Sequence, residues 1–444
     1  MKTVIMAGGR GTRISNLFPD IPKPLIPIKD GNGIEKPVLE WEIRSLVAQG
    51  FTDIILTVSH MADKIEAYFG TGEQLGCRIS YFRETVPLGN AGALFKMREE
   101  LDDPFLLLNA DAVFDVDFNR MVKYHQEKGG LVTLFTHPNS HPYDSGIVIA
   151  QDDKSVSAWL TKEDARPKWY KNRVNAGLHV IDPVVLDMTI QRTGLEPDSI
   201  GTTGVDGKTI KVDLDRQILK PLCGTGKMFA YDSPEYVKDM GTPERYESVC
   251  RDFQSGTVAA KNLSNKQRAI FLDRDGTINR YVGFLRKIED FELLPGVSET
   301  IKKINASGYL CIVVTNQPVI ARGEVTVEEL QLIHNKMEIE LGKQGAYIDG
   351  LYYCPHHPDK GFEGEVKELK IDCDCRKPKP GLLLRASEDF NIRLEDSWMI
   401  GDGKNDVGAG KAAGCKTVLI GSENYGQDVT SNSLLTAVEQ ILGK

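Results

Sequence analysis

A short apolar run that ends in two closely spaced carboxylates constrains this chain more than any other feature. Residues 271–277 read FLDRDGT, and the apolar residues 269–272 predict a buried strand that Gly276 brings to an end. Side chains at alternate positions of an extended segment point the same way, so Asp273 and Asp275 are expected to face together. Two such acids repel unless a cation or a proton lies between them. The pair therefore predicts a magnesium ion, a carboxylate nucleophile and a neighbouring acid/base, although a lone Asp-x-Asp more often marks a surface loop.

Length and charge narrow the class of protein. The chain has 444 residues, so two or three domains are expected. Its formal net charge of −9 argues against general nucleic-acid binding, but local Lys and Arg can still line phosphate sites. No apolar run is long enough to span a bilayer, and the start MKTVIMAGG leads into a strand and a glycine loop rather than a signal peptide. We expect a cytoplasmic enzyme that acts on small molecules, and a homo-oligomer is left open.

Apolar runs alternate with helical stretches, which is typical of a mostly parallel α/β sheet. In the first half, strands are expected at 3–7, 53–59 and 105–110, and helices at 37–49 and 61–69. In the second half, strands are expected at 269–273, 309–316, 397–402 and 416–421, and helices near 296–306 and 326–344. The small, polar stretch between them has no periodicity. We predict two Rossmann-like α/β domains, 1–253 and 268–444, joined by a linker at 254–267.

The first half begins with a glycine-rich turn, MAGGRGTR, at residues 6–13. Glycines let backbone amides approach a phosphate closely, and Arg10 and Arg13 add positive charge. Lys23 follows between two prolines. The spacing differs from the dinucleotide fingerprint and from the ATPase P-loop. The turn therefore predicts a phosphate site of another kind.

Three later segments complete this pattern. PLGNAGAL (87–94) is a second glycine turn, and LLLNADAVFDVD (106–117) is a buried strand that ends where a metal ligand, Asp111, would lie. KDMGTPERYE (238–247) has Asp239 before a turn. In isolation, each of these two aspartates would more often be a turn or cap residue.

Together, GGRGTR, PKPL, PLGNAGA, NAD and DMGTPE resemble, in this order, the sugar-1-phosphate nucleotidyltransferase family over essentially residues 1–250. The resemblance implies in-line attack of a sugar phosphate oxygen on the α-phosphorus of a nucleoside triphosphate, with release of pyrophosphate. It implies that Asp111 and Asp239 hold magnesium. The implied nucleotide- and sugar-binding residues are Gly8, Gly9, Gly11, Arg13, Lys23, Glu84, Gly89, Asn109, Asn175 and Gly177. Asn90 departs from the family's usual threonine, and Lys162 matches a family lysine only loosely.

The second half adds three elements after FLDRDGTIN. VVTNQ (313–317) is a strand that ends in Thr315 and Asn316. CRKPKPG (375–381) supplies Arg376 and Lys377, and MIGDGKNDVGAG (399–410) supplies Asp402 and Asp406. A nucleophile, a hydroxyl–amide pair, a lysine and a further acid are the parts of a phosphoaspartate mechanism.

These motifs resemble the haloacid-dehalogenase-like phosphatases over about residues 268–425, here with a minimal cap. The resemblance implies that Asp273 attacks phosphorus and that Asp275 protonates the leaving oxygen and then deprotonates water. It implies phosphoryl contacts from Thr315, Asn316 and Lys377, with Arg376 beside them. Asp273, the backbone carbonyl of Asp275, and Asp402 would hold magnesium, with support from Asp406.

A cysteine cluster narrows the second resemblance. YYCPHHPD (352–359) and DCDCRKP (372–378) bring Cys354, Cys373 and Cys375 near each other in the sequence, a set suited to structural zinc. Spacing alone allows either His356 or His357 as the fourth ligand, and the family pattern selects His356. This pattern, with IARG at 320–323, resembles heptose 1,7-bisphosphate phosphatases and histidinol-phosphate phosphatases.

The two halves suggest consecutive reactions. A phosphatase that removes the distal phosphate of a sugar bisphosphate leaves a sugar 1-phosphate, which a nucleotidyltransferase consumes. The leading hypothesis is hydrolysis of D-glycero-D-manno-heptose 1,7-bisphosphate at the 7-phosphate, then transfer of GMP from GTP to give GDP-heptose for surface polysaccharide. The alternative is a mannose- or other hexose-1-phosphate nucleotidyltransferase fused to a histidinol-phosphate-type phosphatase. A non-catalytic sensing module is disfavoured, because Asp273, Lys377, Asp111 and Asp239 are all present.

Overall fold

The computed structural model describes residues 1–9, 13–110, 112–143, 145–204 and 207–443. The chain divides into two compact units, which are described separately. The first comprises 1–136, 148–159 and 175–262, and the second comprises 137–147, 160–174 and 263–444. None of the described helices is both long and apolar enough to cross a membrane.

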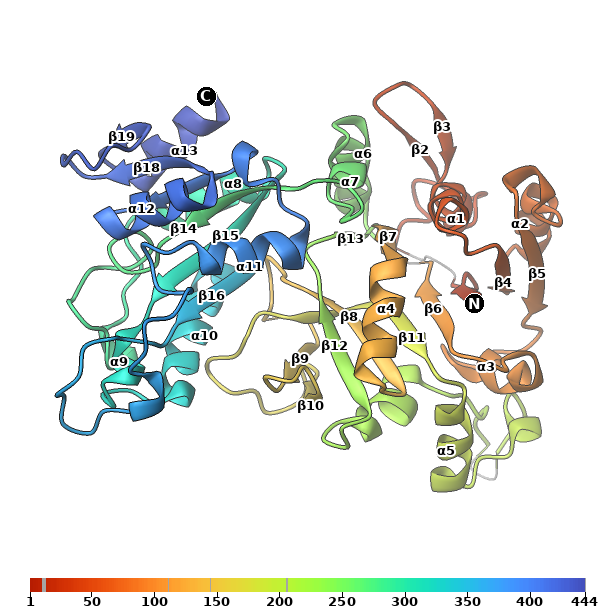
Figure 1. Ribbon diagram of the computed structural model, residues 1–444. Helices are drawn as coiled ribbons and strands as arrows, with labels where there is room; N and C mark the ends of the chain where they lie inside the picture. The colour runs from red at the N-terminus through yellow and green to blue at the C-terminus, as the bar shows by residue number, and fades with distance from the viewer. Residues whose placement is uncertain (10–12, 111, 144, 205–206, 444) are drawn as a thin grey trace. The chain divides into compact units, whose positions relative to one another are not determined.

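A large mixed sheet forms the centre of the first unit (Figure 1). Its strands are β1 (Lys2–Met6), β4 (Asp53–Val58), β5 (Arg78–Arg83), β6 (Phe105–Asn109), β8 (Val132–His137), β9 (Ile147–Ala150), β10 (Val156–Leu160), β11 (Val174–Ile181) and β12 (Met228–Asp232). The order β6-β1-β4-β5 is parallel, whereas β11 runs antiparallel to β6 and β9. Two small antiparallel pairs join β2 (Pro27–Lys29) to β3 (Glu35–Pro37), and β7 (Ala112–Asp115) to β13 (Tyr236–Asp239).

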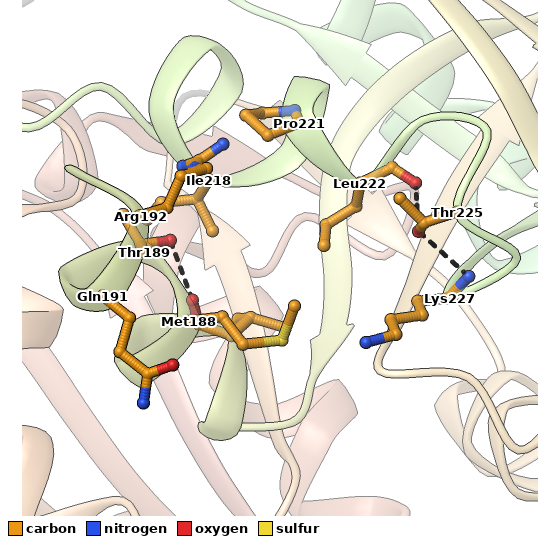
Figure 2. A pocket seen from close by; sticks show the side chains of 10 residues that line it. Met188, Thr189, Gln191, Arg192, Ile218, Pro221, Leu222, Thr225 and Lys227 are labelled. Atoms are coloured by element: carbon orange, nitrogen blue, oxygen red, sulfur yellow. Dashed lines mark hydrogen bonds between the residues drawn. The ribbon is translucent and has the colours of Figure 1, made fainter.

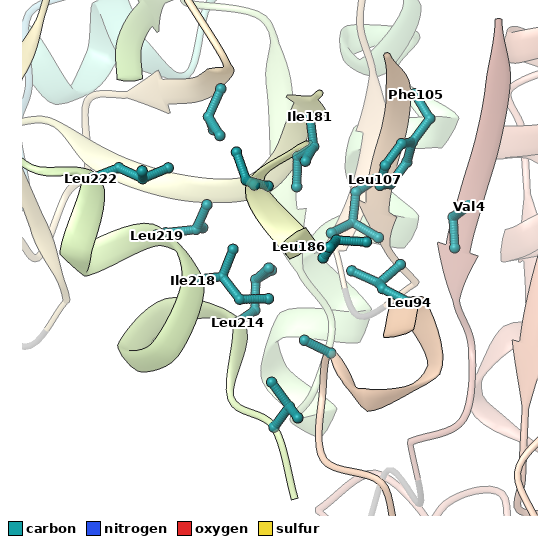
Figure 3. Packing of buried hydrophobic residues seen from close by; sticks show 14 of the residues in the cluster. Val4, Leu94, Phe105, Leu107, Ile181, Leu186, Leu214, Ile218, Leu219 and Leu222 are labelled. Carbon is teal, nitrogen blue, oxygen red and sulfur yellow. The ribbon is translucent and has the colours of Figure 1, made fainter. Parts of the chain in front are cut away.

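Alternating side chains of these strands fill two cores, one on each face of the sheet. On one face, Ile5 and its neighbours pack against α1 (Val38–Ala48), α2 (Ala62–Phe69) and α4 (Phe118–Lys128). On the other face, Val4 and its neighbours pack against α3 (Gly92–Lys96), α5 (Val184–Thr193) and a π-helix at Leu214–Leu219 (Figure 3). Helices α6 (Pro243–Gln254) and α7 (Thr257–Ala260) complete the unit.

The second unit is built on a parallel sheet with helices on both faces (Figure 1). Its strands, in the spatial order β16-β15-β14-β17-β18-β19, are Gly350–Cys354, Tyr309–Asn316, Arg268–Leu272, Trp398–Gly401, Lys416–Ile420 and Val429–Ser431. Ile270 and Leu272 pack against α8 (Val297–Asn305), α10 (Val327–Lys343) and α13 (Leu434–Leu442). Ala269 and Phe271 pack against α11 (Gly381–Phe390) and α12 (Lys404–Ala413), and α9 (Pro318–Ala321) follows β15. The α/β class predicted from the sequence is confirmed.

Two stretches from earlier in the chain are part of the second unit. Ile147, Tyr170 and Val174 form a buried cluster with Ile339 of α10. Arg173 forms an ion pair of 3.3 Å with Glu338, and both side chains are almost fully buried. The compact second unit therefore includes more than the continuous stretch 268–444 of the predicted domain.

Candidate active sites

The carboxyl ends of three neighbouring strands in the second unit bring charged side chains together. Asp273 directly follows β14, Asn316 ends β15, and Asp402 directly follows β17. The carboxyl edge of a parallel α/β sheet is where such folds bind ligands. One oxygen each from Asp273, Asp402 and Asp406 lies within 4.8 Å of the others. These three carboxylates form the acidic centre of the candidate phosphatase site.

Lys377 is the cation of this acidic centre. Its Nζ atom donates to Asp273 Oδ1 at 2.7 Å, to Asp406 Oδ1 at 2.6 Å and to the carbonyl oxygen of Val314 at 2.8 Å. Burial alone would lower the pKa of Lys377, but the two carboxylates outweigh burial and raise it. The lysine therefore stays protonated.

Burial dominates the titration of the two aspartates at the strand ends. It raises the pKa of Asp273 to about 6, with Lys377 opposing and Asp406 adding to the shift. Burial, with the charge of Asp273, also raises the pKa of Asp402 to about 6. A bound cation would offset the cost of ionising these buried, neighbouring carboxylates, and oxygen ligands of this kind suit a hard cation.

Asp275 has a separate set of partners. Its carboxylate accepts hydrogen bonds from Arg274 Nη2 at 2.8 and 3.0 Å, Asn279 Nδ2 at 3.0 Å and Gln317 Nε2 at 2.9 Å. Burial would raise the pKa of Asp275, but Arg274 and the two amides outweigh it and lower the pKa. Because β14 ends at Leu272, the alternation expected of an extended strand stops before the two acids. Their repulsion is relieved by different cations, Lys377 for Asp273 and Arg274 for Asp275.

The remaining predicted phosphoryl contacts lie around Lys377. Asn316 forms two hydrogen bonds of 3.0 Å with the backbone of Lys377. Thr315 Oγ1 accepts a hydrogen bond of 2.9 Å from Gln317, and Arg376 donates to the carbonyl oxygen of His356 at 3.1 Å. The strand end and the lysine loop are therefore joined at the acidic centre.

The predicted zinc ligands converge in the structure. The Sγ atoms of Cys354, Cys373 and Cys375 lie 3.2 to 3.5 Å apart. His356 Nδ1 lies 3.2 Å from Cys375 Sγ, whereas His357 Nδ1 accepts a hydrogen bond from the amide of Asp359. Tetrahedral zinc with Zn–S bonds of about 2.3 Å separates sulfurs by about 3.8 Å. The four side chains need only small shifts to fit such an ion.

In the first unit, Asp239 lies among basic side chains. Lys23 Nζ is 3.8 Å from Asp239 Oδ1, and Arg245 also forms an ion pair with Asp239. A Cβ added at Gly241 would lie 3.0 Å from an Arg13 guanidinium nitrogen and 2.9 Å from Asp239 Oδ1, so Arg13 is close by. The structure therefore brings three predicted residues, Arg13, Lys23 and Asp239, to one place.

Close neighbouring atoms explain two of the predicted glycines, Gly89 and Gly177. Gly8 lies two residues after β1, near Glu84, and a Cβ there would lie at the ordinary contact distance of 3.9 Å from Glu84 Oε1. Burial raises the pKa of Glu84. Gly89 has a φ of +86°, and a Cβ there would lie 2.3 Å from the carbonyl oxygen of Val212. Gly177 has a φ of +77°, and a Cβ there would lie 3.0 Å from Asn109 Nδ2.

The other predicted residues of the first unit have simpler settings. Gly9 lies in the irregular segment after β1, and Asn175 Oδ1 is 3.2 Å from His179 Nε2. Asn90 accepts a hydrogen bond from the amide of Leu214, and Lys162 lies in the turn after β10. Arg10, Gly11 and Asp111 lie outside the described residues.

Four side chains that contact these sites have no role in the sequence prediction: Arg245, Arg274, Asn279 and Gln317. Gln317 follows the predicted Thr315–Asn316 pair directly, and Arg274 lies between the two predicted acids. That adjacency was the one available signal. It gives no direction for either side chain.

A pocket of about 390 Å³ lies elsewhere in the first unit, beside α5 and the π-helix (Figure 2). Its lining residues are Val185, Met188, Thr189, Gln191, Arg192, Ile218, Pro221, Leu222, Thr225 and Lys227. None of the predicted site residues lines it. The pocket is therefore separate from the candidate active sites.

Comparison with known proteins gives matches for each half of the chain. The nucleotidyl transferase family model matches residues 2–252, and a HAD-hydrolase-like model matches residues 374–438. The chain is 44% identical over 155 residues to the D-glycero-beta-D-manno-heptose-1,7-bisphosphate 7-phosphatase of Pasteurella multocida, covering 35% of this chain and 82% of the relative. The enzyme of the same name from Escherichia coli K12 is 41% identical over 152 residues, which cover 34% of this chain and 78% of the relative.

A solved structure also aligns with part of this chain. HddC from Yersinia pseudotuberculosis aligns over 57% of this chain and 99% of its own, with 24% identity and a TM-score of 0.44. The two family matches confirm the order of activities predicted from the motifs, with a nucleotidyltransferase before a phosphatase. The chain thus belongs to the nucleotidyl transferase family through its first half, and its second half belongs with the heptose-bisphosphate 7-phosphatases among the HAD-like hydrolases.

Proposed function

We propose that the chain is a bifunctional enzyme of GDP-heptose biosynthesis. Its second half hydrolyses the 7-phosphate of D-glycero-D-manno-heptose 1,7-bisphosphate, and its first half transfers GMP from GTP to the resulting heptose 1-phosphate. The observation that carries this proposal is the identity of 44% to a heptose-bisphosphate 7-phosphatase, on the same chain as a nucleotidyl transferase domain. The product of one reaction is the substrate class of the other.

In the phosphatase reaction, Asp273 is the proposed nucleophile. A carboxylate oxygen forms a bond to phosphorus, the bond to the sugar oxygen breaks, and Asp275 gives that oxygen a proton. Water then attacks the phosphoaspartate, Asp275 takes the water's proton, and inorganic phosphate leaves with Asp273 regenerated. A bound phosphate dianion near Asp275 would raise its pKa and favour the protonated form that the first step needs.

Charge neutralisation accompanies both steps. Lys377, Thr315 and Asn316 are the proposed ligands of the phosphoryl oxygens. Magnesium, when bound by Asp273, Asp402 and the backbone carbonyl of Asp275, neutralises the charge of the transferring phosphoryl group. The close approach of the three carboxylates fits such an ion.

A structural zinc ion would be held by Cys354, His356, Cys373 and Cys375. The loop that carries Cys375 continues directly into Arg376 and Lys377. Fixing this loop would hold both cations near the acidic centre.

In the transferase reaction, a sugar phosphate oxygen displaces pyrophosphate from the α-phosphorus of the nucleotide. Arg13 and Lys23 would bind the nucleotide phosphates, and Asp239, with Asp111, would hold magnesium. The ion pairs of Asp239 with Lys23 and Arg245 support this role, because they gather charge of both signs at one place. GTP as the donor rests on the family resemblance of the motifs and on the pathway that heptose implies.

We further propose that the enzyme works in the cytoplasm on small molecules, as part of the supply of heptose for surface glycans. Its substrates, GTP and sugar phosphates, are cytoplasmic metabolites. The free cysteines, including the cluster proposed to bind zinc, are consistent with a reducing compartment.

One reaction mixture tests the proposed sequence. Purified protein given the heptose bisphosphate, GTP and magnesium should release phosphate and pyrophosphate and form GDP-heptose. A panel of ATP, UTP, CTP and dTTP with heptose 1-phosphate identifies the base preference. Turnover of mannose 1-phosphate without turnover of the heptose substrates would overturn the proposal.

A further inference from the structure

The arginine between the two acids of FLDRDGT is completely buried. Arg274 is 0% exposed and is among the largest fully buried side chains among the described residues. Its Nη2 atom reaches both oxygens of Asp275, and its Nε atom lies 3.3 Å from Asp275 Oδ1. A buried guanidinium is costly unless it is paired and hydrogen-bonded. Arg274 therefore needs partners for its remaining nitrogen as well.

His334 of α10 supplies that partner. Arg274 Nη1 lies 3.0 Å from His334 Nε2, and His334 is 1% exposed. Because arginine can only donate, Nε2 must accept, and the ring proton is on Nδ1. Burial, with the charge of Arg274, holds the pKa of His334 well below its usual value, so the ring stays neutral and keeps its acceptor.

The chain of contacts thus runs from a helix to a predicted acid/base. His334 fixes one end of the guanidinium, and the other end grips both oxygens of Asp275. Asn279, four residues further along the same loop, and Gln317, directly after β15, each donate one hydrogen bond to this carboxylate, whereas Arg274 contacts both of its oxygens. A carboxylate held by a fork of two donors has its plane fixed, which a single hydrogen bond does not achieve.

We propose that Arg274 and His334 are positioning residues for Asp275 in the phosphatase reaction. Neither is proposed to touch the substrate. His334 orients the guanidinium, and the guanidinium orients the carboxylate that exchanges protons with the leaving oxygen and with water. The inference rests on the proposed phosphatase function and adds two residues that carry no role in the mechanism above.

Substrates with different leaving groups distinguish a misplaced Asp275 from a general loss of active-site structure. A sugar alkoxide is a poor leaving group and needs a proton from Asp275, whereas 4-nitrophenolate leaves without one. The ratio kcat/KM reports steps through formation of the phosphoaspartate, so the later hydrolysis common to both substrates does not enter. A misplaced acid should therefore reduce kcat/KM for the sugar phosphate much more than for 4-nitrophenyl phosphate.

The experiment compares three variants on the same helix. His334→Leu removes the acceptor, and His334→Gln keeps an amide oxygen that can accept. Met337→Leu, the control, exchanges one buried apolar side chain of the α10 core for another. We expect His334→Leu to lower kcat/KM for the heptose bisphosphate at least about tenfold and for 4-nitrophenyl phosphate less than about threefold. His334→Gln should recover most of the loss, and Met337→Leu should leave both values near those of the native enzyme.

Arg274→Met removes the other partner of the Arg274–His334 contact and is a second, independent test. It should give the same difference between substrates, and thermal unfolding of each variant identifies any that fail to fold. Equal losses for both substrates in folded His334→Leu and Arg274→Met, or no loss for either, would overturn the inference. If the native enzyme leaves the heptose bisphosphate intact, the proposed substrate is wrong, and fructose 1,6-bisphosphate, which also has an alkoxide leaving group, replaces it in the comparison.

Discussion

At the scale of single residues, the candidate phosphatase site is a balance of buried charges. Lys377 is 2% exposed and contacts the carboxylates of Asp273 and Asp406. Arg274 forms an ion pair with a third carboxylate, that of Asp275. Removing one member of such a group leaves another without its counter-charge. Substitutions that preserve shape are therefore the informative ones.

Asp273→Asn is the sharpest of these substitutions. It keeps the volume of the side chain but removes the nucleophile, so phosphate release should fall by at least about 1000-fold. Nucleotidyl transfer should be unchanged, because its predicted residues are in the other unit. Phosphate and pyrophosphate release, measured separately, check this expectation. Asp396→Asn, at an exposed ion pair with Arg393, is the control.

Equal loss of both activities in folded Asp273→Asn protein would contradict two independent sites. The comparison requires the unfolding transition of the variant to match that of the native protein.

The sequence motifs predicted which residues would lie together at this site, but they did not predict the hydrogen bonds that hold those residues in place. Asp273 and Asp402 could be proposed because each directly follows a strand within a recognisable motif, and Lys377 because it lies in the CRKPKPG motif of a loop. Arg274 could not, because a strand pattern directs it away from both neighbouring acids. The strand ends one residue before Asp273, and the turn that follows brings the guanidinium back to Asp275. The alternation of apolar and polar residues predicts the strand, but it does not predict the geometry of the turn that follows it.

At the scale of elements, the strand bounds follow apolar runs closely. The run predicted at 309–316 is β15. The run at 53–59 is one residue longer than β4, and the run at 269–273 is shifted by one residue from β14. The antiparallel strand β11 is harder to predict, because its pairing with β6 joins residues about 70 positions apart. The pattern of one strand does not specify a distant partner.

The loop at residues 372–378, which carries two of the proposed zinc ligands, should depend on that metal for its order. Cys373→Ser removes one of the four converging side chains proposed to bind zinc. The variant should therefore lose the zinc that the native protein is proposed to bind, and its phosphatase kcat/KM should fall at least about tenfold. Nucleotidyl transfer should persist. Metal analysis by mass spectrometry and the two assays check the result. Cys415→Ala, a buried cysteine outside the cluster, is the control, and full zinc content in Cys373→Ser would contradict the proposed site.

The π-helix at Leu214–Leu219 contains a carboxylate that burial should make costly. Burial, with the charge of Asp213, raises the pKa of Asp215 from 3.8 to about 6. The folded state therefore binds the proton more tightly than the unfolded state, and stability is lost as pH rises from about 4 to about 6. The shift corresponds to at most about 3 kcal/mol, which partial exposure reduces to about 1 kcal/mol.

Asp215→Asn should therefore raise the free energy of unfolding by about 1 kcal/mol at pH 7 and change it little below pH 4. Denaturant unfolding at the two pH values measures this difference. Asp198→Asn, at a fully exposed side chain, is the control. An equal effect of Asp215→Asn at both pH values would contradict the assigned cause.

At the scale of the whole molecule, the proposed function predicts that the sugar phosphate made by the second half is released before the first half uses it. A mixture of Asp273→Asn and Asp239→Asn proteins should therefore make GDP-heptose from the heptose bisphosphate, although neither variant should do so alone. Product formation followed by chromatography measures the result. If each variant completes its remaining reaction but the mixture gives no product, the intermediate does not pass between molecules.

The three-part composition of the second unit has a consequence for synthesis of the chain. Arg173 and Glu338, the buried ion pair, are 165 positions apart. At translation rates of about 5 to 20 residues per second, Arg173 waits roughly 10 to 30 s for its partner to leave the ribosome. During that interval Ile147 and Tyr170 also lack Ile339, the α10 side chain of their buried cluster. The nascent first half therefore exposes apolar side chains at Ile147 and Tyr170. Chaperones are expected to bind this segment until α10 has been synthesised.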